Sequence, residues 1–123
     1  MKKILLVEDT PDLLANITDV LSMEGFEVIP ANDGVDALEK LTAIKPDLII
    51  TDLLMPRMDG FAFIQTLKAD NNLKEIPVLI FSAKATPENE AQGLQLGAVQ
   101  YLKKPCPTDY LLKIIHNLIS QTD

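Results

Sequence analysis

The stretch from Asp47 to Asp52 constrains the fold more than any other part of the chain. Its three consecutive apolar residues, Leu48 to Ile50, leave no polar face, which is typical of a strand buried between two layers of helices. The strand is expected to end on Asp52, because Pro56 cannot continue a ladder of hydrogen bonds. In an open α/β sheet, ligands bind just outside the carboxyl ends of the strands. Asp52 is therefore either a functional residue or a simple strand cap, and this stretch alone does not separate the two.

Short apolar runs alternate five times with segments of helical periodicity. The expected strands cover residues 4–7, 26–31, 47–52, 78–82 and 99–102. The expected helices run from the Thr10 cap to Gly25, from Val35 to a stop at Pro46, from Gly60 onward, from the Thr86 cap to Gly97, and from the Thr108 cap to about Ser120. This alternation predicts an α/β fold with helices on both faces of a parallel sheet. Pro30 lacks a backbone donor and places the second strand at an edge, which favours a doubly wound five-stranded sheet of order 2-1-3-4-5.

Length, charge and cysteine content exclude several classes of protein. The 123 residues fit one domain, residues 1–123, long enough to form a core without disulfides or metals. A net charge of −7 argues against a nucleic-acid or anionic-membrane surface, which needs clustered Lys and Arg. The single cysteine, Cys106, fits a reducing compartment, and no apolar run approaches the roughly 20 residues of a membrane span. We therefore expect a cytoplasmic domain that binds neither nucleic acid nor membrane.

Polar side chains gather at the carboxyl ends of the expected strands. Glu8 and Asp9 follow the first strand, Asp52 ends the third, Ser82 ends the fourth and Lys104 follows the fifth. Three carboxylates at one edge repel each other unless a cation is present, and Mg²⁺ prefers such oxygen ligands. A nucleophilic Asp, a metal, an ammonium and a hydroxyl are the components of phosphoryl transfer onto a carboxylate. The alternative, that these residues only cap helices and strands, requires all five to meet at one edge by accident.

Four motifs make the chain resemble the receiver domain of two-component response regulators, of which CheY is the single-domain example. They are Val7–Asp9, Asp52–Gly60 with the pattern D-x-x-M-P-x-M-D-G, Phe81–Ala83 and Tyr101–Pro105. The resemblance covers essentially all of the chain and implies the flavodoxin-like fold of that family. Together the four motifs are far more specific than any one of them.

The resemblance implies a role for each acidic residue. Asp52 would accept a phosphoryl group from a phosphohistidine, carried by a histidine kinase or a histidine phosphotransfer protein. Glu8, Asp9, Asp52 and the backbone carbonyl of Leu54 would hold Mg²⁺, for which Mn²⁺ could substitute. Lys104 would pair with the phosphoryl group. The domain would then be a phosphoacceptor in phosphorelay signalling, not an enzyme with a turnover substrate.

The resemblance also implies a switch. Ser82 would move toward the phosphoryl oxygen, Tyr101 would turn inward, and the peptide bond from Lys104 to Pro105 would be cis. The face built by the fourth helix, fifth strand and fifth helix would then bind a downstream effector or a second copy of the chain. Gly93 weakens the fourth helix, as a movable element requires. The last helix has a wide apolar arc that serves either such a contact or a broad core face: Tyr110, Leu111, Leu112, Ile114, Ile115, Leu118 and Ile119.

Other functions remain as alternatives at this stage. A flavodoxin-like electron carrier needs Ser, Thr and Gly donors after the first strand, where this chain has Glu8–Asp12. A haloacid-dehalogenase-type phosphatase needs an Asp two residues after the nucleophile, where this chain has Leu54. A receiver-like module that only binds proteins is disfavoured because every acceptor-site position is filled. Cys106 is interpreted as a small buried apolar residue, and His116 as a surface residue.

Overall fold

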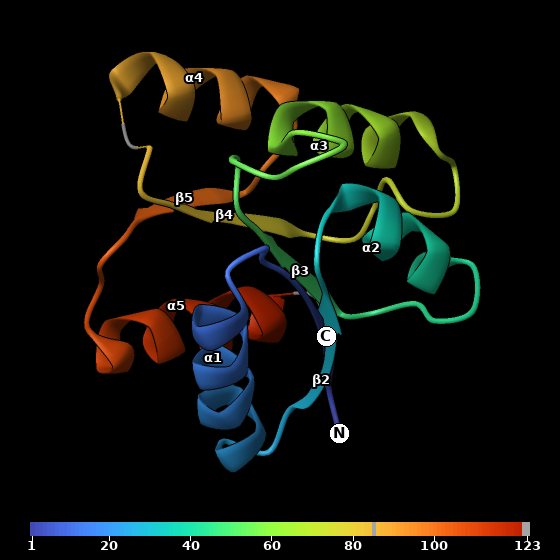
Figure 1. Cartoon of the computed structure of the whole chain (residues 1–123). Coiled ribbons are helices and arrows are strands. Elements are labelled where there is room, and N and C mark those ends of the chain that lie inside the picture. The colour runs from blue at the N-terminus through green and yellow to red at the C-terminus, as the bar shows by residue number, and fades with distance from the viewer. Residues whose placement is uncertain (85, 122–123) are drawn as a thin grey trace.

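The computed structural model describes residues 1–84 and 86–121, in which strands and helices alternate (Figure 1). The strands are β1 (Lys3–Val7), β2 (Glu27–Ala31), β3 (Leu48–Thr51), β4 (Val78–Ser82) and β5 (Gln100–Lys103). The helices are α1 (Pro11–Met23), α2 (Gly34–Leu41), α3 (Gly60–Ala69), α4 (Pro87–Leu96) and α5 (Thr108–Gln121). All five expected strands and all five expected helices are present.

The five strands form one parallel sheet in the order β2-β1-β3-β4-β5, as predicted. Pro30 lies in the edge strand β2, where its missing N–H breaks no interior ladder. The register pairs Val7 of β1 with Thr51 of β3, and Ser82 of β4 with Lys103 of β5. The residues that follow these pairs therefore leave the sheet at the same edge.

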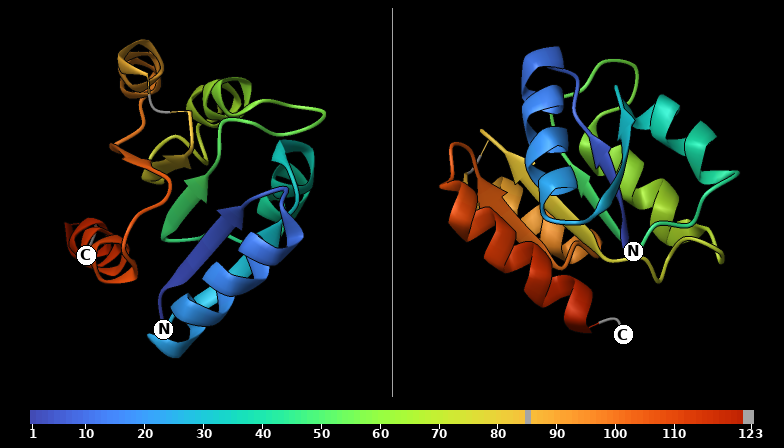
Figure 2. Two further views of the ribbon diagram at one scale, coloured as in Figure 1. Left: turned by 60° about the vertical axis from the view of Figure 1, so that its left-hand side comes forward. Right: turned by 90° about the horizontal axis from the view of Figure 1, so that it is seen from below.

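Helices cover both faces of the sheet. Figure 1 shows α1 and α5 on one face and α2, α3 and α4 on the other, and the right-hand view of Figure 2 looks onto the first face. Alternate residues of each strand point to opposite faces. In β1, Ile4 and Leu6 therefore join the core under α1 and α5, whereas Leu5 and Val7 join the core under α2 and α3. None of the described helices is long and apolar enough to cross a membrane.

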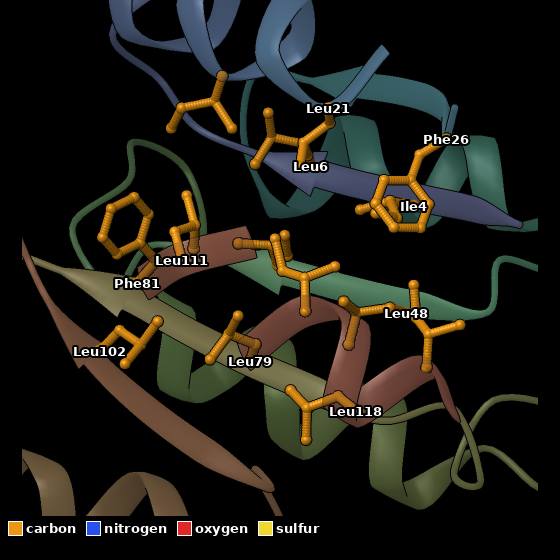
Figure 3. Close-up of a cluster of buried hydrophobic side chains, with 14 residues drawn as sticks. Ile4, Leu6, Leu21, Phe26, Leu48, Leu79, Phe81, Leu102, Leu111 and Leu118 are labelled. Carbon is orange, nitrogen blue, oxygen red and sulfur yellow. The ribbon is translucent and has the colours of Figure 1, made fainter. Parts of the chain in front are cut away.

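Each face has its own core. Figure 3 shows the first, which includes Leu79 of β4, Leu21 of α1 and Leu111 of α5. The second core centres on Phe63 of α3, whose side chain is fully buried. Full burial of one such side chain contributes about 1.5–3 kcal/mol to stability. Most of the apolar arc of α5 belongs to the first core, and Tyr110 is its exposed member.

Three sequence expectations about element ends were wrong in detail. β3 ends at Thr51, not at Asp52, because the Asp52 carboxylate accepts the next backbone N–H and turns the chain. α2 ends at Leu41, well before Pro46. At this end, the Thr42 hydroxyl donates to the Glu39 carbonyl.

Thr10 and Thr108 were both expected to cap helices. Thr10 occupies the cap position, with Pro11 as the first helical residue, as predicted. Its side chain makes no cap hydrogen bond, and its backbone N–H donates to the Glu8 carboxylate at 3.1 Å. Thr108 is already the first residue of α5, since the Pro107 carbonyl accepts the Leu111 N–H. The Thr86 cap is present, with its hydroxyl accepting from the Asn89 N–H at 3.2 Å.

Candidate functional site

Three carboxylates meet where β1 and β3 end. Glu8, Asp9 and Asp52 each offer an oxygen, and these oxygens lie within 4.8 Å of one another. The cause is the register, because Val7 and Thr51 are paired neighbours and the acids come directly after them. Glu8 and Asp52 are buried, with 3% and 8% of their surface exposed, whereas Asp9 faces solvent. The cluster is thus half inside the protein and open on one side.

Both oxygens of the Asp52 carboxylate are engaged. Oδ1 accepts the backbone N–H groups of Leu53, at 2.6 Å, and of Leu54, at 3.3 Å. Oδ2 accepts a hydrogen bond from Lys104 Nζ at 2.8 Å. Burial alone would raise the pKa of Asp52, but the donors Lys104 and Ser82 more than offset it, so that the pKa lies below its ordinary value. Asp52 is therefore a fixed, ionised carboxylate at neutral pH.

Lys104 supplies the positive charge of the site. Its ammonium donates to Glu8 Oε1 as well as to Asp52, and it lies 5.5 Å from the centre of the Phe81 ring. Burial alone would lower the pKa of Lys104, but its two carboxylate partners raise it above the ordinary lysine value. The backbone N–H of Lys104 donates to the Ser82 carbonyl at 2.9 Å, and its peptide bond to Pro105 is cis.

The donor set suits a hard divalent cation. Carboxylate oxygens are the preferred ligands of Mg²⁺, which keeps several waters and therefore needs an open side, as Asp9 provides. Leu54, whose backbone carbonyl is the fourth expected ligand, stands two residues after Asp52 and donates its N–H to that carboxylate. The residues at this edge therefore fit a bound metal ion.

Ser82 and Tyr101 lie on the neighbouring strands β4 and β5. Ser82 is fully buried, and its hydroxyl accepts the Lys84 N–H at 3.2 Å. The phenol oxygen of Tyr101 is also buried, and among the described residues no group hydrogen-bonds to it. Burial raises the pKa of this phenol, partly offset by the nearby Ser82 hydroxyl. Tyr101 was expected to turn inward on phosphorylation, yet its phenol oxygen already lies inside the protein.

Two glycines have packing roles that the sequence alone does not reveal. A Cβ on Gly60 would lie 2.4 Å from the Asp52 carbonyl oxygen, so α3 starts this close to Asp52 only because residue 60 has no side chain. A Cβ on Gly93 would lie 2.4 Å from Ile80 Cδ1. Gly93 was interpreted only as a weak point of α4, and the structure adds that it brings α4 close to β4.

An ion pair between Asp33 and Arg57 was not predicted. Arg57 Nε donates to Asp33 Oδ2 at 2.6 Å, and Arg57 Nη2 donates to Asp33 Oδ1 at 2.8 Å. The partners are 24 residues apart, and no local pattern links them. The one available signal was Asp33 itself, an N-cap residue in the short connection between β2 and α2.

Of two further residues, His116 lies at the surface as predicted, whereas Cys106 was expected to be buried and is only half-buried. His116 is exposed on α5, with its Nε2 3.4 Å from Glu24 Oε2, and its ring lies beside that of Phe26 at an angle of 40° with ring centres 5.2 Å apart. Cys106 is half-buried against the first core and lines a groove of about 430 Å³ between α1 and α5. Burial raises the pKa of its thiol, which favours the unreactive protonated form.

Comparison with known proteins decides the family. A family model of the response regulator receiver domain matches residues 4–116. The chain belongs to this family. The receiver domain is 39% identical, over 95% of its length, to the hybrid signal transduction histidine kinase D of Dictyostelium discoideum, of which it covers 8%. It is 34% identical, over its whole length, to the DNA-binding dual master transcriptional regulator RpaA of Synechocystis sp., of which it covers 51%.

Solved receiver structures agree with this assignment. The chemotaxis response regulator CheY4 of Vibrio cholerae matches with a TM-score of 0.90 at 33% identity, over 96% of this chain and 98% of that one. The receiver domain spans about half of the curated regulator it matches and a small part of the kinase. It is a response regulator receiver domain of two-component signalling, with the flavodoxin-like fold that the sequence predicted.

Proposed function

We propose that Asp52 accepts a phosphoryl group from a phosphohistidine on a histidine kinase or a histidine phosphotransfer protein. The observation that carries this proposal is the position of one ionised, hydrogen-bonded carboxylate between two further acids and a fixed ammonium. No other described group combines burial, a lowered pKa and an open neighbouring metal-ligand set in this way.

The transfer needs a carboxylate nucleophile and a means of holding charge. An Asp52 oxygen forms the bond to phosphorus, the phosphorus–nitrogen bond of the phosphohistidine breaks, and the imidazole keeps the electron pair and takes up a proton. The Lys104 ammonium, already at Asp52, stays beside the new charge, and the Ser82 hydroxyl donates to a phosphoryl oxygen. Mg²⁺, or Mn²⁺ in its place, would neutralise phosphoryl charge when held by Glu8, Asp9, Asp52 and the Leu54 carbonyl.

The phosphorylated state is transmitted through the face formed by α4, β5 and α5. Ser82 of β4 and Tyr101 of β5 lie on paired neighbouring strands between Asp52 and this face. Gly93 of α4 packs against Ile80 of β4. The face exposes apolar side chains for an effector or a second copy of the chain to cover: Leu94, Val99 and Tyr110. The domain acts as a switch without a turnover substrate. The free thiol of Cys106 supports a cytoplasmic location.

Intact-mass measurement after incubation with acetyl phosphate and Mg²⁺ tests the acceptor. Wild type is expected to gain the mass of one phosphate, and Asp52→Asn none. Asp59→Asn is the matched control, because it removes an acid from the same loop while asparagine can still cap α3 in place of the Asp59 carboxylate. That control should gain one phosphate. Phosphorylation of Asp52→Asn as readily as wild type would show that the acceptor is another residue.

A further inference from the structure

The segment between Asp52 and α3, residues 53–59, is called the acceptor loop here because it begins at the phosphoacceptor. Its first residues donate the two N–H groups that hold Asp52 Oδ1. Its ends are tied to each other, since the Gly60 N–H donates to the Leu53 carbonyl at 2.9 Å. The geometry at the acceptor therefore depends on what holds the middle of this loop.

The middle of the acceptor loop is a strained turn. The Met58 N–H donates to the Pro56 carbonyl at 2.7 Å, which makes Arg57 the central residue of a γ-turn. Its φ is +67°, and Arg57 is the only described non-glycine residue with a positive φ. Such a conformation costs free energy in a residue with a side chain, and it persists only where surrounding contacts enforce it. The strain points to a functional constraint on this loop.

The Arg57 side chain supplies one enforcing contact. Its guanidinium makes both hydrogen bonds to Asp33, whose side chain is only 5% exposed while that of Arg57 is 58% exposed. Asp33 is in turn fixed, because its Oδ1 caps α2 by accepting the Asp36 N–H at 2.9 Å. Arg57 is the only arginine in the sequence, and the two-pronged bond requires the planar guanidinium fork, which lysine lacks.

Met58 supplies a second enforcing contact at the same place. A Cβ on Gly34, next to Asp33, would lie 3.0 Å from Met58 Sδ, so the thioether packs directly on the Gly34 backbone. Two adjacent loop residues thus contact two adjacent residues at the start of α2. Together, the two contacts fix the acceptor loop against the start of α2. A single exposed ion pair would contribute little stability by itself.

We propose that Arg57 is a positioning residue for phosphorylation, because its bond to Asp33 fixes the acceptor loop. The fixed loop keeps the Leu53 and Leu54 N–H groups on the Asp52 carboxylate. It also keeps the Leu54 carbonyl available to the metal ion that the acid cluster would hold. This inference rests on the proposed function of Asp52. Arg57 acts through the loop and contacts neither the phosphoryl group nor the metal. Its removal is expected to lower the apparent affinity of the site for Mg²⁺ before it changes the fold.

The first test compares Arg57→Ala and Arg57→Lys with wild type. In Arg57→Ala, the Mg²⁺ concentration for half-maximal phosphorylation by acetyl phosphate should rise about tenfold, as for other residues that orient metal ligands. Arg57→Lys keeps the charge but loses the fork, and should lie between the two. In the metal-free protein, amide hydrogen exchange at residues 53–58 should also be about tenfold faster in Arg57→Ala. Lys45→Ala, an exposed cation in the α2–β3 connection, is the matched charge control and should behave as wild type.

The second test separates positioning from mere stability. Arg57→Ala leaves the Asp33 carboxylate buried without its counter-charge, so it should also unfold more readily. Adding Asp33→Asn removes that charge while asparagine still caps α2, so the double variant should recover stability. The double variant should still need as much Mg²⁺ for half-maximal phosphorylation as Arg57→Ala, because its acceptor loop still lacks the Arg57–Asp33 bond.

The outcomes are distinguishable. If the double variant regains both wild-type stability and the wild-type Mg²⁺ concentration for half-maximal phosphorylation, Arg57 has only a structural role and the inference is overturned. Arg57→Ala with wild-type Mg²⁺ dependence and wild-type exchange in the acceptor loop would overturn it as well. A wild-type chain that gains no phosphate would instead overturn the proposed function of Asp52.

Discussion

The two halves of the site, at the same edge of one sheet, are built in opposite ways. Around Asp52, the two carboxylates of Glu8 and Asp52 share the Lys104 ammonium, and backbone N–H groups occupy the remaining Asp52 oxygen. Around Tyr101, a buried phenol has no hydrogen-bonding partner among the described residues, and α4 contacts β4 through a glycine. In the acceptor half, both oxygens of each buried carboxylate accept hydrogen bonds, whereas the switch half leaves a buried hydroxyl without a described partner.

This difference predicts how substitutions in each half will change the stability of the domain. Removing the Lys104 ammonium from the acceptor half lowers the free energy of unfolding, because the two carboxylates that it pairs with stay buried. In the switch half, the Tyr101 hydroxyl makes no hydrogen bond with a described residue, so moving or removing it breaks none and costs little stability. We therefore expect substitutions in the acceptor half to have large effects on stability, and substitutions in the switch half to have small effects or effects of the opposite sign.

Lys104→Ala should break the acceptor half most severely. It leaves Glu8 and Asp52 buried without their cation, and the free energy of unfolding should fall by about 3 kcal/mol. Mg²⁺ should restore more stability in this variant than in wild type, because an ion bound to the folded state then replaces the missing charge. Urea unfolding with and without Mg²⁺ measures both effects. The neighbouring exposed Lys103 is the control, and Lys103→Ala should change stability by less than about 0.5 kcal/mol.

Gly93→Ala should test the packing between the two halves. Alanine favours the helix by about 1 kcal/mol, but its Cβ would overlap Ile80 Cδ1, and overpacking typically costs about 1–3 kcal/mol. A net loss of about 1 kcal/mol and faster amide exchange in α4 are expected from these opposing terms. Adding Ile80→Val removes the obstructing methyl group and should recover most of the loss. If the double variant is no more stable than Gly93→Ala, close approach at residue 93 is not the cause.

Tyr101→Phe should have the smallest effect, and of opposite sign. Removing a buried hydroxyl that lacks a partner relieves a desolvation penalty, so stability should stay constant or rise by about 1 kcal/mol. Tyr110, whose side chain is exposed on α5, provides the matched control, and Tyr110→Phe should leave the midpoint of thermal unfolding unchanged. A clear loss of stability in Tyr101→Phe alone would mean that the phenol is hydrogen-bonded in solution.

Much of the fold follows from local patterns in the sequence. The apolar runs at residues 4–7 and 78–81 predict strands without regard to tertiary contacts, and Pro30 places β2 at an edge. The acidic residues at the strand ends could also be placed at one edge from the alternation alone. These features depend on periodicity and on the absence of one backbone donor, which are visible in the chain itself.

Other features depend on contacts between distant segments. Gly93 looks like a helix defect until Ile80 is seen against it, and Arg57 looks like a solvent-exposed cation until Asp33 is seen beneath it. The Pro46 expectation was wrong for a related reason, since the Thr42 hydroxyl donates to the Glu39 carbonyl at the end of α2. Propensity and spacing do not report which of two local partners a backbone group will choose.

Parallel pairing of Val7 with Thr51 and of Ser82 with Lys103 has a consequence for building chimeric regulators. A single inserted or deleted residue inside β3 would turn Asp52 toward the opposite helix layer, because side chains alternate with every step along a strand. Extra residues in the connection between α3 and β4, at the other end of the sheet, would not change the direction in which the Asp52 side chain points. Crossover points for domain grafts therefore belong in the connections at the amino ends of the strands.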